Sequence, residues 1–228
     1  MRDNIAEMLR DIRQEVRLTR SWIGKDHLDE RVLAAMAKVP RHEFVPEELD
    51  YLAYSNGPLG IGHGQTISQP YIVALMTDLL NPRAGDVVLE VGTGSGYQAA
   101  VLSLLVKRVY SIEVVAALAQ QATARLGRLE YDNVVVRCGD GYRGWPEHAP
   151  FDAVIVTAAS PIIPPPLVDQ LKPGGRMVIP VGLPYDRQIL TVVTKDERGE
   201  VTVKELLPVA FVPLTGDHGQ DVHSGDNS

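Results

Sequence analysis

The sequence predicts an α/β fold: a mostly parallel, doubly wound sheet with antiparallel strands at its C-terminal end and a helical cap at its N-terminus. From residue 86 onward, short apolar strands alternate with helical segments. These strands are apolar on both faces, as in parallel sheets covered on two sides. The last two strand segments alternate in polarity, which is typical of antiparallel strands, and the first forty residues carry helical periodicity.

The N-terminal part is predicted to be a helical cap. Its first helix is indicated by apolar residues at helical spacing, namely Ile5, Met8, Leu9, Ile12 and Val16. A second helix runs from about residue 29 to 38 and ends near Val39, because Pro40 disfavours a helical conformation in the residue before it. Residues 41–62 are interpreted as irregular chain with turns. A third helix has Pro70 in its first turn.

The remaining elements follow in the order expected of a parallel sheet. Strands are predicted at 86–91, 108–114, 133–138, 151–159 and 174–181, with helices at 97–106, 115–126 and 166–171 between them. Two further strands, 188–195 and 201–214, close the sheet. We expect residues 1–216 to form a single domain, with a cap over 1–60 and a catalytic core over 61–216. Residues 217–228 have no apolar content and are expected to be a disordered tail.

Composition limits the class of protein. The 228 residues are 45% hydrophobic and 22% charged, with a net charge of −7. This balance disfavours nucleic acid as the main partner. The single cysteine fits a reducing compartment, and no apolar run reaches membrane-spanning length. The N-terminus has no apolar signal region. We expect a cytoplasmic protein without a membrane partner, and favour a monomer.

A glycine loop follows the first core strand and indicates a ligand site. Glu90 precedes Gly92, Gly94 and Gly96, and Tyr97 stands where the dinucleotide fingerprint requires its last glycine. An acid before the loop would repel a pyrophosphate but could bind an ammonium group. A ligand with an amino-acid end and an adenosine end fits this arrangement, and S-adenosylmethionine is the candidate.

Two more acids lie where a nucleoside would need them. Glu113 ends the second core strand, where an acid can pair with ribose hydroxyls. Asp140 and Gly141 follow the third strand, where a carboxylate can accept from an adenine amino group and a glycine leaves space for the ring. Each has a simpler reading, as a solvated strand end or as a turn. Three acids at the ends of three successive strands favour the cofactor.

Seven segments of the chain together resemble the protein-L-isoaspartate (D-aspartate) O-methyltransferase family. They are VPRHEFVP (39–46), GQTISQP (64–70), VLEVGTGSGYQ (88–98), GDG (139–141), PFDAVIVTAA (150–159), LKPGGRMVIPVG (171–182) and FVPLTG (211–216). They stand in the family's order over most of residues 30–216. The glycine loop is shared by many methyltransferases, whereas GQTISQP and FVPLT are more particular to this family.

The resemblance implies a Rossmann-like class I methyltransferase sheet and an enzyme of protein repair. Such enzymes methylate the free carboxyl of isoaspartyl residues in age-damaged proteins, using S-adenosylmethionine and releasing S-adenosylhomocysteine. The ester then collapses to a succinimide, which can reopen to normal aspartate. Acceptance of D-aspartyl residues is left open. The cofactor-binding residues implied are Glu90, Gly92, Thr93, Gly94, Gly96, Glu113, Asp140, Gly141 and Thr215.

The resemblance also places the catalytic hydroxyl at Ser68. Thr66 and Ile67 are expected to contact substrate beside it, and Pro180 and Val181 to line a peptide groove. From spacing alone, Ser68 is more simply a cap for the helix that starts near Pro70; the family match favours the catalytic role. No Cys/His spacing suggests a metal.

The sequence disfavours three other functions. A methyltransferase acting on RNA or a small metabolite is permitted by the glycine loop but disfavoured by the acidic charge and by TAAS after the fourth core strand, where an amine-positioning motif would stand. A nicotinamide dehydrogenase is disfavoured by Glu90 and the glycine pattern. A non-catalytic cofactor-binding protein is disfavoured by Ser68 together with all three acids.

Overall fold

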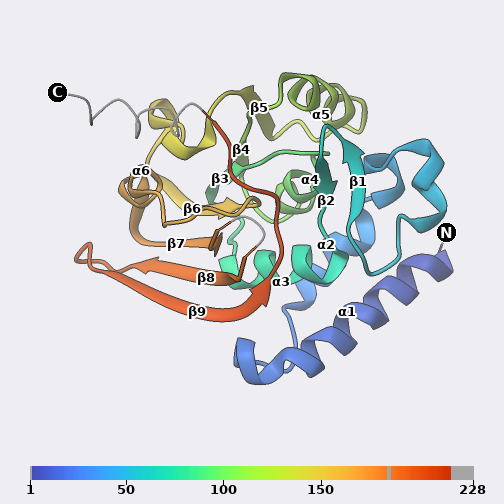
Figure 1. The fold of residues 1–228 in the computed structure, drawn as a ribbon, viewed down its shortest axis with the longest axis horizontal. Coiled ribbons are helices and arrows are strands. Elements are labelled where there is room, and N and C mark those ends of the chain that lie inside the picture. The colour runs from blue at the N-terminus through green and yellow to red at the C-terminus, as the bar shows by residue number, and fades with distance from the viewer. Residues whose placement is uncertain (1, 184–185, 217–228) are drawn as a thin grey trace.

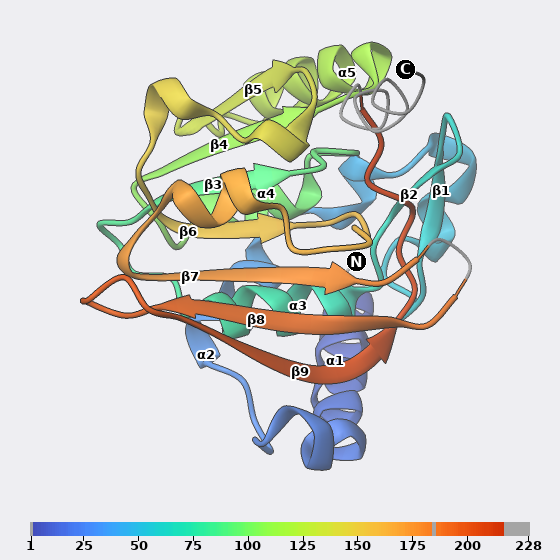
Figure 2. The ribbon, with the colours of Figure 1, turned by 60° about the vertical axis from the view of Figure 1, so that its left-hand side comes forward.

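The computed structural model describes residues 2–183 and 186–216, so the tail predicted for 217–228 lies outside the described residues. Seven strands form the main sheet (Figure 1; Figure 2). In sheet order they are β5 (Val134–Cys138), β4 (Arg108–Glu113), β3 (Val87–Val91), β6 (Phe151–Val156), β7 (Leu171–Val181), β8 (Gln188–Lys195) and β9 (Val201–Val209).

The strand directions confirm the predicted fold class. Neighbouring strands from β5 to β7 are parallel. Both β8 and β9 run antiparallel to their neighbours, which gives the antiparallel C-terminal end. Since β8 and β9 follow β7 in both sequence and space, hairpin connections suffice to build this part of the sheet.

Both faces of the sheet are apolar because successive side chains alternate between two cores. Val88 and Val109 join one core with the helices α3 (Pro70–Leu80), α4 (Tyr97–Ser103) and α5 (Ala116–Arg128). Leu89 and Val91 join the other core, on the side of α6 (Pro165–Asp169) and of the short 3-10 helices η3 (Gly141–Arg143) and η4 (Pro146–His148). This two-sided burial explains the nearly continuous apolar strands in the sequence.

The order of the parallel strands reverses at β3. The chain passes from β3 outward to β4 and β5, and then returns to lay β6 and β7 on the other side of β3. The connections after β3 and β6 therefore leave in opposite directions and open a crevice at the carboxyl ends of these strands, where α/β sheets bind ligands.

After β9 the chain crosses that same edge of the sheet. The N–H of Ala159 donates to Val212 O at 2.8 Å, and the N–H of Leu214 donates to Ala159 O at 2.7 Å. Residues 210–215 thus lie across the ends of the core strands (Figure 2). This return brings the predicted Thr215 to the crevice.

The predicted helical cap is confirmed. It consists of α1 (Arg2–Ile23) and α2 (Glu30–Lys38), which pack against α3, and α1 also contacts β9. Asp29 caps α2, accepting from the N–H of Arg31 at 2.8 Å. The division into a cap over 1–60 and a core over 61–216 stays a prediction.

Residues 41–62 are more regular than predicted. They contain the 3-10 helices η1 (Arg41–Phe44) and η2 (Glu47–Leu52) and the strand β1 (Leu59–Gly62), which forms a hairpin with β2 (Gln65–Ile67). The irregular-chain prediction was wrong because these elements are too short to show a periodicity. His63 lies in the hairpin turn, exposed and with φ of 53°.

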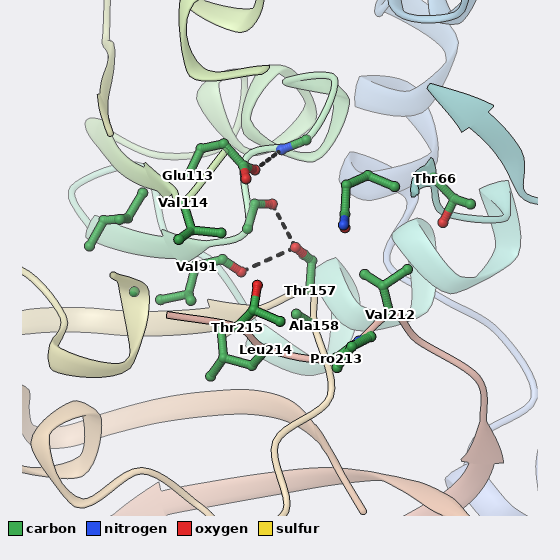
Figure 3. Close-up of a pocket in the computed structure, with 15 residues that line it drawn as sticks. Thr66, Val91, Glu113, Val114, Thr157, Ala158, Val212, Pro213, Leu214 and Thr215 are labelled. Atoms are coloured by element: carbon green, nitrogen blue, oxygen red, sulfur yellow. Dashed lines mark hydrogen bonds between the residues drawn. The ribbon is translucent and has the colours of Figure 1, made fainter. Parts of the chain in front are cut away.

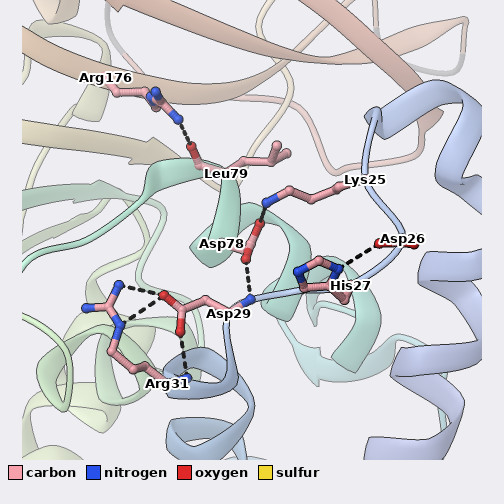
Figure 4. Close-up of polar contacts among 8 residues, drawn as sticks. All are labelled: Lys25, Asp26, His27, Asp29, Arg31, Asp78, Leu79 and Arg176. Carbon is pink, nitrogen blue, oxygen red and sulfur yellow. Dashed lines mark hydrogen bonds and ion pairs between the residues drawn. The ribbon is translucent and has the colours of Figure 1, made fainter.

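A buried carboxylate fastens the cap to α3. Asp78, in the last turn of α3, has a side chain only 2% exposed. It pairs with the Lys25 ammonium and accepts from the N–H of Asp29 at 2.7 Å (Figure 4). Both donors lie in the connection between α1 and α2, so one acid fixes where that connection meets the core.

We expect Lys25→Met to lower the free energy of unfolding by about 1–3 kcal/mol, because it leaves the Asp78 carboxylate buried with only one partner. Urea unfolding at neutral pH measures this loss. The matched control is Arg13→Met, which breaks an ion pair whose two side chains are 43% and 77% exposed and should cost less than about 0.5 kcal/mol. Equal losses for the two variants would contradict the anchoring role of Asp78.

Candidate active site

A first cleft lies at the crevice where the strand order reverses. Its walls come from β2, from the ends of β3, β4 and β6, from Gly141 after β5 and from residues 212–215 (Figure 3). A second cleft adjoins it between the start of α3 and the segment after β9, and the two share Thr66, Thr157 and Val212.

The glycine loop after β3 forms the floor of the first cleft. Gly92, Gly94 and Gly96 all have positive φ, and the requirement for glycine is clearest at Gly92, where φ is 96°. A Cβ there would lie 2.4 Å from Thr157 Oγ1. Gly92 and Gly94 line the cleft, whereas Gly96 is the cap residue before α4 and packs against Leu126 of α5.

Glu113 is fixed at the end of β4 with its carboxylate on the cleft wall. One oxygen accepts from the N–H of Gly94 at 2.7 Å and the other from the N–H of Val115 at 3.0 Å. The acid is thus held against the glycine loop, and Ile112 and Val114 provide apolar wall beside it (Figure 3). This is the position from which an acid reaches ribose hydroxyls.

Glu90 lies beneath the loop and does not line the cleft. Its carboxyl is fully buried and bonds to the Ser111 hydroxyl, which lies 2.5 Å from the Thr93 hydroxyl. Burial raises the pKa of Glu90 to about 8. Its other oxygen, Oε1, has no hydrogen-bond partner among the described residues. The structure thus connects Glu90 to the loop through Thr93, and its contact with a ligand ammonium stays a prediction.

Asp140, Gly141 and Thr215 come together at the far end of the cleft. Asp140 caps η3, accepting from the N–H of Tyr142 at 2.9 Å, and its carboxyl packs against Gly216. Gly141 and Thr215 line the cleft itself. A Cβ on Gly141 would lie 2.4 Å from Val91 Cγ1, so only glycine lets the chain approach β3 this closely.

The substrate residues predicted on the hairpin face the glycine loop. Thr66, Ile67 and Ser68 line one hollow together with residues 92–95 of that loop. Thr66 is exposed, Ser68 is half-buried and Ile67 is buried, which anchors this end of the hairpin in the core. Ser68 and Thr66 also line the second cleft.

The interpretation of Ser68 as a helix cap is wrong. The cap residue of α3 is Gln69, which makes no side-chain cap bond, and the N–H of Tyr71 in the first turn donates to Asn56 Oδ1 at 3.2 Å. Among the described residues, the Ser68 hydroxyl has no hydrogen-bond partner, and the only bond recorded to Ser68 from a side chain is to its backbone carbonyl. The hydroxyl therefore remains available to a ligand.

Pro180 and Val181 are not brought into either cleft. They end β7, where Pro180 O accepts from the N–H of Ser160 at 3.1 Å and Ser160 O accepts from the N–H of Gly182 at 2.9 Å. Both residues therefore support the connection after β6. Their contact with substrate stays a prediction.

Thr157 is the site residue that sequence reasoning missed. Its hydroxyl lies 2.6 Å from Gly92 O and 3.1 Å from Val91 O (Figure 3), and its N–H donates to Val91 O at 2.9 Å, so it joins the ends of β3 and β6. It lines both clefts and the hollow beside Ser68. In the sequence it lay inside the strand predicted at 151–159, whereas in the structure β6 ends at Val156.

The residues of the first cleft fit S-adenosylmethionine. Glycines let the backbone come close to a ligand at Gly92 and Gly141, Glu113 presents acceptors for hydroxyls, and Val114 and Leu214 supply apolar surface for a base. We searched the described residues for clusters of three or more potential metal ligands and found none. None of the described helices is long and apolar enough to span a membrane.

Fold and site together define an S-adenosylmethionine-dependent methyltransferase. The model of the protein-L-isoaspartate(D-aspartate) O-methyltransferase (PCMT) family matches residues 16–219. The chain belongs to this family.

Individual relatives agree with this assignment. The chain is 62% identical over 213 residues to protein-L-isoaspartate O-methyltransferase 2 of Syntrophobacter fumaroxidans, covering 93% of this chain and 86% of that one. It is 61% identical over 212 residues to the enzyme of the same name from Nitrosococcus oceani, covering 93% and 96%.

Solved structures show the same fold. One protein-L-isoaspartate O-methyltransferase superposes with a TM-score of 0.76 at 29% identity, over 90% of this chain and 66% of that chain. A Plasmodium falciparum structure, described as a beta-aspartate methyltransferase (PCMT) in complex with S-adenosyl-L-homocysteine, has a TM-score of 0.71 at 27% identity, over 90% and 97%.

We expect Glu90→Gln to change how stability depends on pH. The pKa of the folded carboxyl is about 8, against an ordinary value of 4.5. Between these values the folded chain keeps a proton that the unfolded chain has released, so the stability of the unaltered protein falls as pH rises through this window. The variant lacks this titration and should gain relative stability, reaching a few kcal/mol at about pH 8.

Urea unfolding at several pH values between about 5 and 8 measures the difference. The exposed Glu7→Gln variant is the control. If the difference in free energy of unfolding between Glu90→Gln and the unaltered protein stays constant with pH, Glu90 is not buried in its uncharged form. Glu90→Gln also tests the predicted contact between Glu90 and the ammonium group of the cofactor. If that contact exists, the variant should bind S-adenosylhomocysteine more weakly than the unaltered protein does.

Proposed function

We propose that this chain transfers a methyl group from S-adenosylmethionine to the free carboxyl of isoaspartyl residues in damaged proteins and peptides, with Ser68 holding that carboxyl. The observation that carries the proposal is the shared hollow: Ser68, whose hydroxyl has no hydrogen-bond partner among the described residues, lines it together with the glycine loop. The methyl ester that forms then collapses to a succinimide, which can reopen to normal aspartate.

The reaction needs no general base. A free carboxyl has a pKa of about 4, so the substrate is already an anion at neutral pH. The cofactor, when bound, supplies a methyl group activated by the sulfonium. What remains for the protein is to bring the carboxylate into line and exclude water, a task of proximity and orientation.

The hairpin suits this task because its contact residues are neutral. The Ser68 hydroxyl can donate to one carboxylate oxygen without lowering its nucleophilicity as a close ion pair would. Thr66 is exposed beside it and can donate a second bond. An acid in either place would repel the substrate.

We assign the cofactor to the first cleft. Gly92, Gly94 and Gly141 would approach it through the backbone, Glu113 would accept from its ribose hydroxyls, and Thr215 would close the far end. Glu90, Thr93 and Gly96 would act from beneath by shaping the loop. Asp140 is proposed to reach the adenine amino group.

The range of substrates, the partners, the cellular location and the oligomeric state are also proposed. The partners proposed are age-damaged proteins with isoaspartyl residues, and D-aspartyl residues are to be tested. The net charge of −7 supports the absence of a nucleic-acid partner. The single cysteine supports action in the cytoplasm, and a monomer is favoured.

We expect transfer of radiolabelled methyl to an isoaspartyl peptide and not to the peptide of the same sequence with normal aspartate. The two differ in where the free carboxyl lies relative to the backbone, and the second cleft must place it beside Ser68. A D-aspartyl peptide is assayed in parallel. Equal labelling of the first two peptides, or labelling of neither, would overturn the proposed function.

We expect Ser68→Ala to lower kcat by roughly 10- to 100-fold, because a hydrogen bond to a charged group contributes about 1.5–3 kcal/mol. Affinity for S-adenosylhomocysteine, measured by calorimetry, should change by less than about 3-fold. The control is Ser55→Ala, at an exposed serine outside the clefts. Full turnover by Ser68→Ala would remove this residue from the mechanism.

A further inference from the structure

The segment VPRHEFVP contains a buried arginine that the proposed function does not yet use. Arg41 has no exposed surface and is the largest of the fully buried side chains. Its Nε donates to Ala53 O at 2.7 Å and its Nη2 donates to Ser68 O at 2.7 Å. Its third nitrogen, Nη1, is buried without a hydrogen-bond partner among the described residues.

This guanidinium has no carboxylate beside it. No ion pair of the described residues involves Arg41, and the nearby Glu43 pairs with Arg128. Burial lowers the pKa of Arg41, but an arginine remains protonated in proteins. The chain therefore buries a positive charge without a counter-charge, which is costly for stability alone.

The contacts of Arg41 point to the two loops of the site. The carbonyl that it holds belongs to Ser68 itself, so the bond restricts the backbone rotation that sets where the Ser68 hydroxyl lies. The guanidinium also lies over the ring of Tyr97, 4.6 Å from its centroid. Tyr97 follows Gly96 directly and begins α4, so Arg41 packs between the hairpin and the end of the glycine loop.

A purely structural role for Arg41 explains only one of its two hydrogen bonds. The bond to Ala53 O ties η1 to the end of η2 and would serve a cap anywhere on the surface. The bond to Ser68 O instead reaches 27 residues along the chain to the catalytic position. A neutral side chain of similar volume would fill the same space without burying an unpaired charge.

We propose that Arg41 is a positioning residue for Ser68: its guanidinium holds the Ser68 carbonyl so that the hydroxyl faces the glycine loop. This inference rests on the proposed function, since it assigns Arg41 a part in presenting the residue that receives the substrate carboxyl. Arg41 does not touch the substrate, because its nitrogens have no surface in either cleft.

The test is a double-mutant cycle of Arg41→Met and Ser68→Ala. We expect Arg41→Met to lower kcat for an isoaspartyl peptide by about 10-fold, with binding of S-adenosylhomocysteine changed by less than about 3-fold in calorimetry. If Arg41 acts through Ser68, adding Arg41→Met to the Ser68→Ala variant should lower kcat no further. A purely structural role would give losses that multiply.

Arg41→Lys is the second variant. It keeps the charge but cannot hold both carbonyls in the fork geometry of arginine, so an intermediate kcat is expected. Arg31→Lys, at an exposed arginine of the cap paired with Asp29, is the matched control and should keep full activity. Thermal unfolding checks that each variant is folded at the assay temperature.

The outcomes separate this inference from the proposed function. Methylation by the unaltered protein, lost in Ser68→Ala, supports the function whatever Arg41 does. Multiplying losses in the cycle, or full activity of Arg41→Met, would overturn the positioning role alone. If neither Arg41 variant folds, Arg41 is a structural residue of the cap and the inference is likewise overturned. An inactive unaltered protein would sink both.

Discussion

One threonine joins the ends of two strands that lie far apart in sequence. Thr157, directly after β6, donates through its hydroxyl to Gly92 O and through its N–H to Val91 O, at the end of β3. These bonds hold the glycine loop against the start of the connection that follows β6, at the place where the strand order reverses. Both clefts and the hollow beside Ser68 have Thr157 in their walls. One contact between adjacent strands therefore helps to set the geometry of both clefts.

Two arginines near this contact hold the loops from behind the surfaces that line the clefts. Arg41 donates to the Ser68 carbonyl from one side, and Arg125 of α5 donates to the Ser95 carbonyl at 2.8 Å from another. Each arginine holds the backbone of one loop. Arg41 lies over the ring of Tyr97 and Arg125 over the ring of Phe44, and these two rings form a T-shaped pair. The proposed substrate residues Thr66, Ile67 and Ser68 are uncharged, which suits a reaction whose nucleophile is already an anion.

The sequence was sufficient for the parts of the fold with a strong repeating pattern. Strands β3 to β7 were predicted because each contains an apolar segment followed by a helix or turn. The antiparallel β8 and β9 were predicted from their alternation, although the second was expected to run to 214 and ends at Val209. The hairpin of β1 and β2 was missed because strands of four and three residues carry no period.

In the site, Glu113 and Gly92 were predicted as cofactor-binding residues because an acid and a glycine stand where core strands end. Burial cannot be read from such a pattern, and so the sequence did not show that Glu90 lies beneath the loop. Thr157 and Arg41 were missed for a related reason. Each bonds to the backbone carbonyl of a residue far away in the chain, and every residue has a carbonyl, so the sequence does not indicate which one accepts the bond.

The return of residues 210–215 across the sheet has a consequence for how the protein is made. These residues pair with Ala159 and supply the last wall of the first cleft, yet they follow every strand of the sheet in the chain. During synthesis the glycine loop and its acids leave the ribosome well before this wall does. Because a ligand stabilises only the form that binds it, a ligand of the first cleft gains its contacts with residues 212–215 only after this segment has crossed the strand ends.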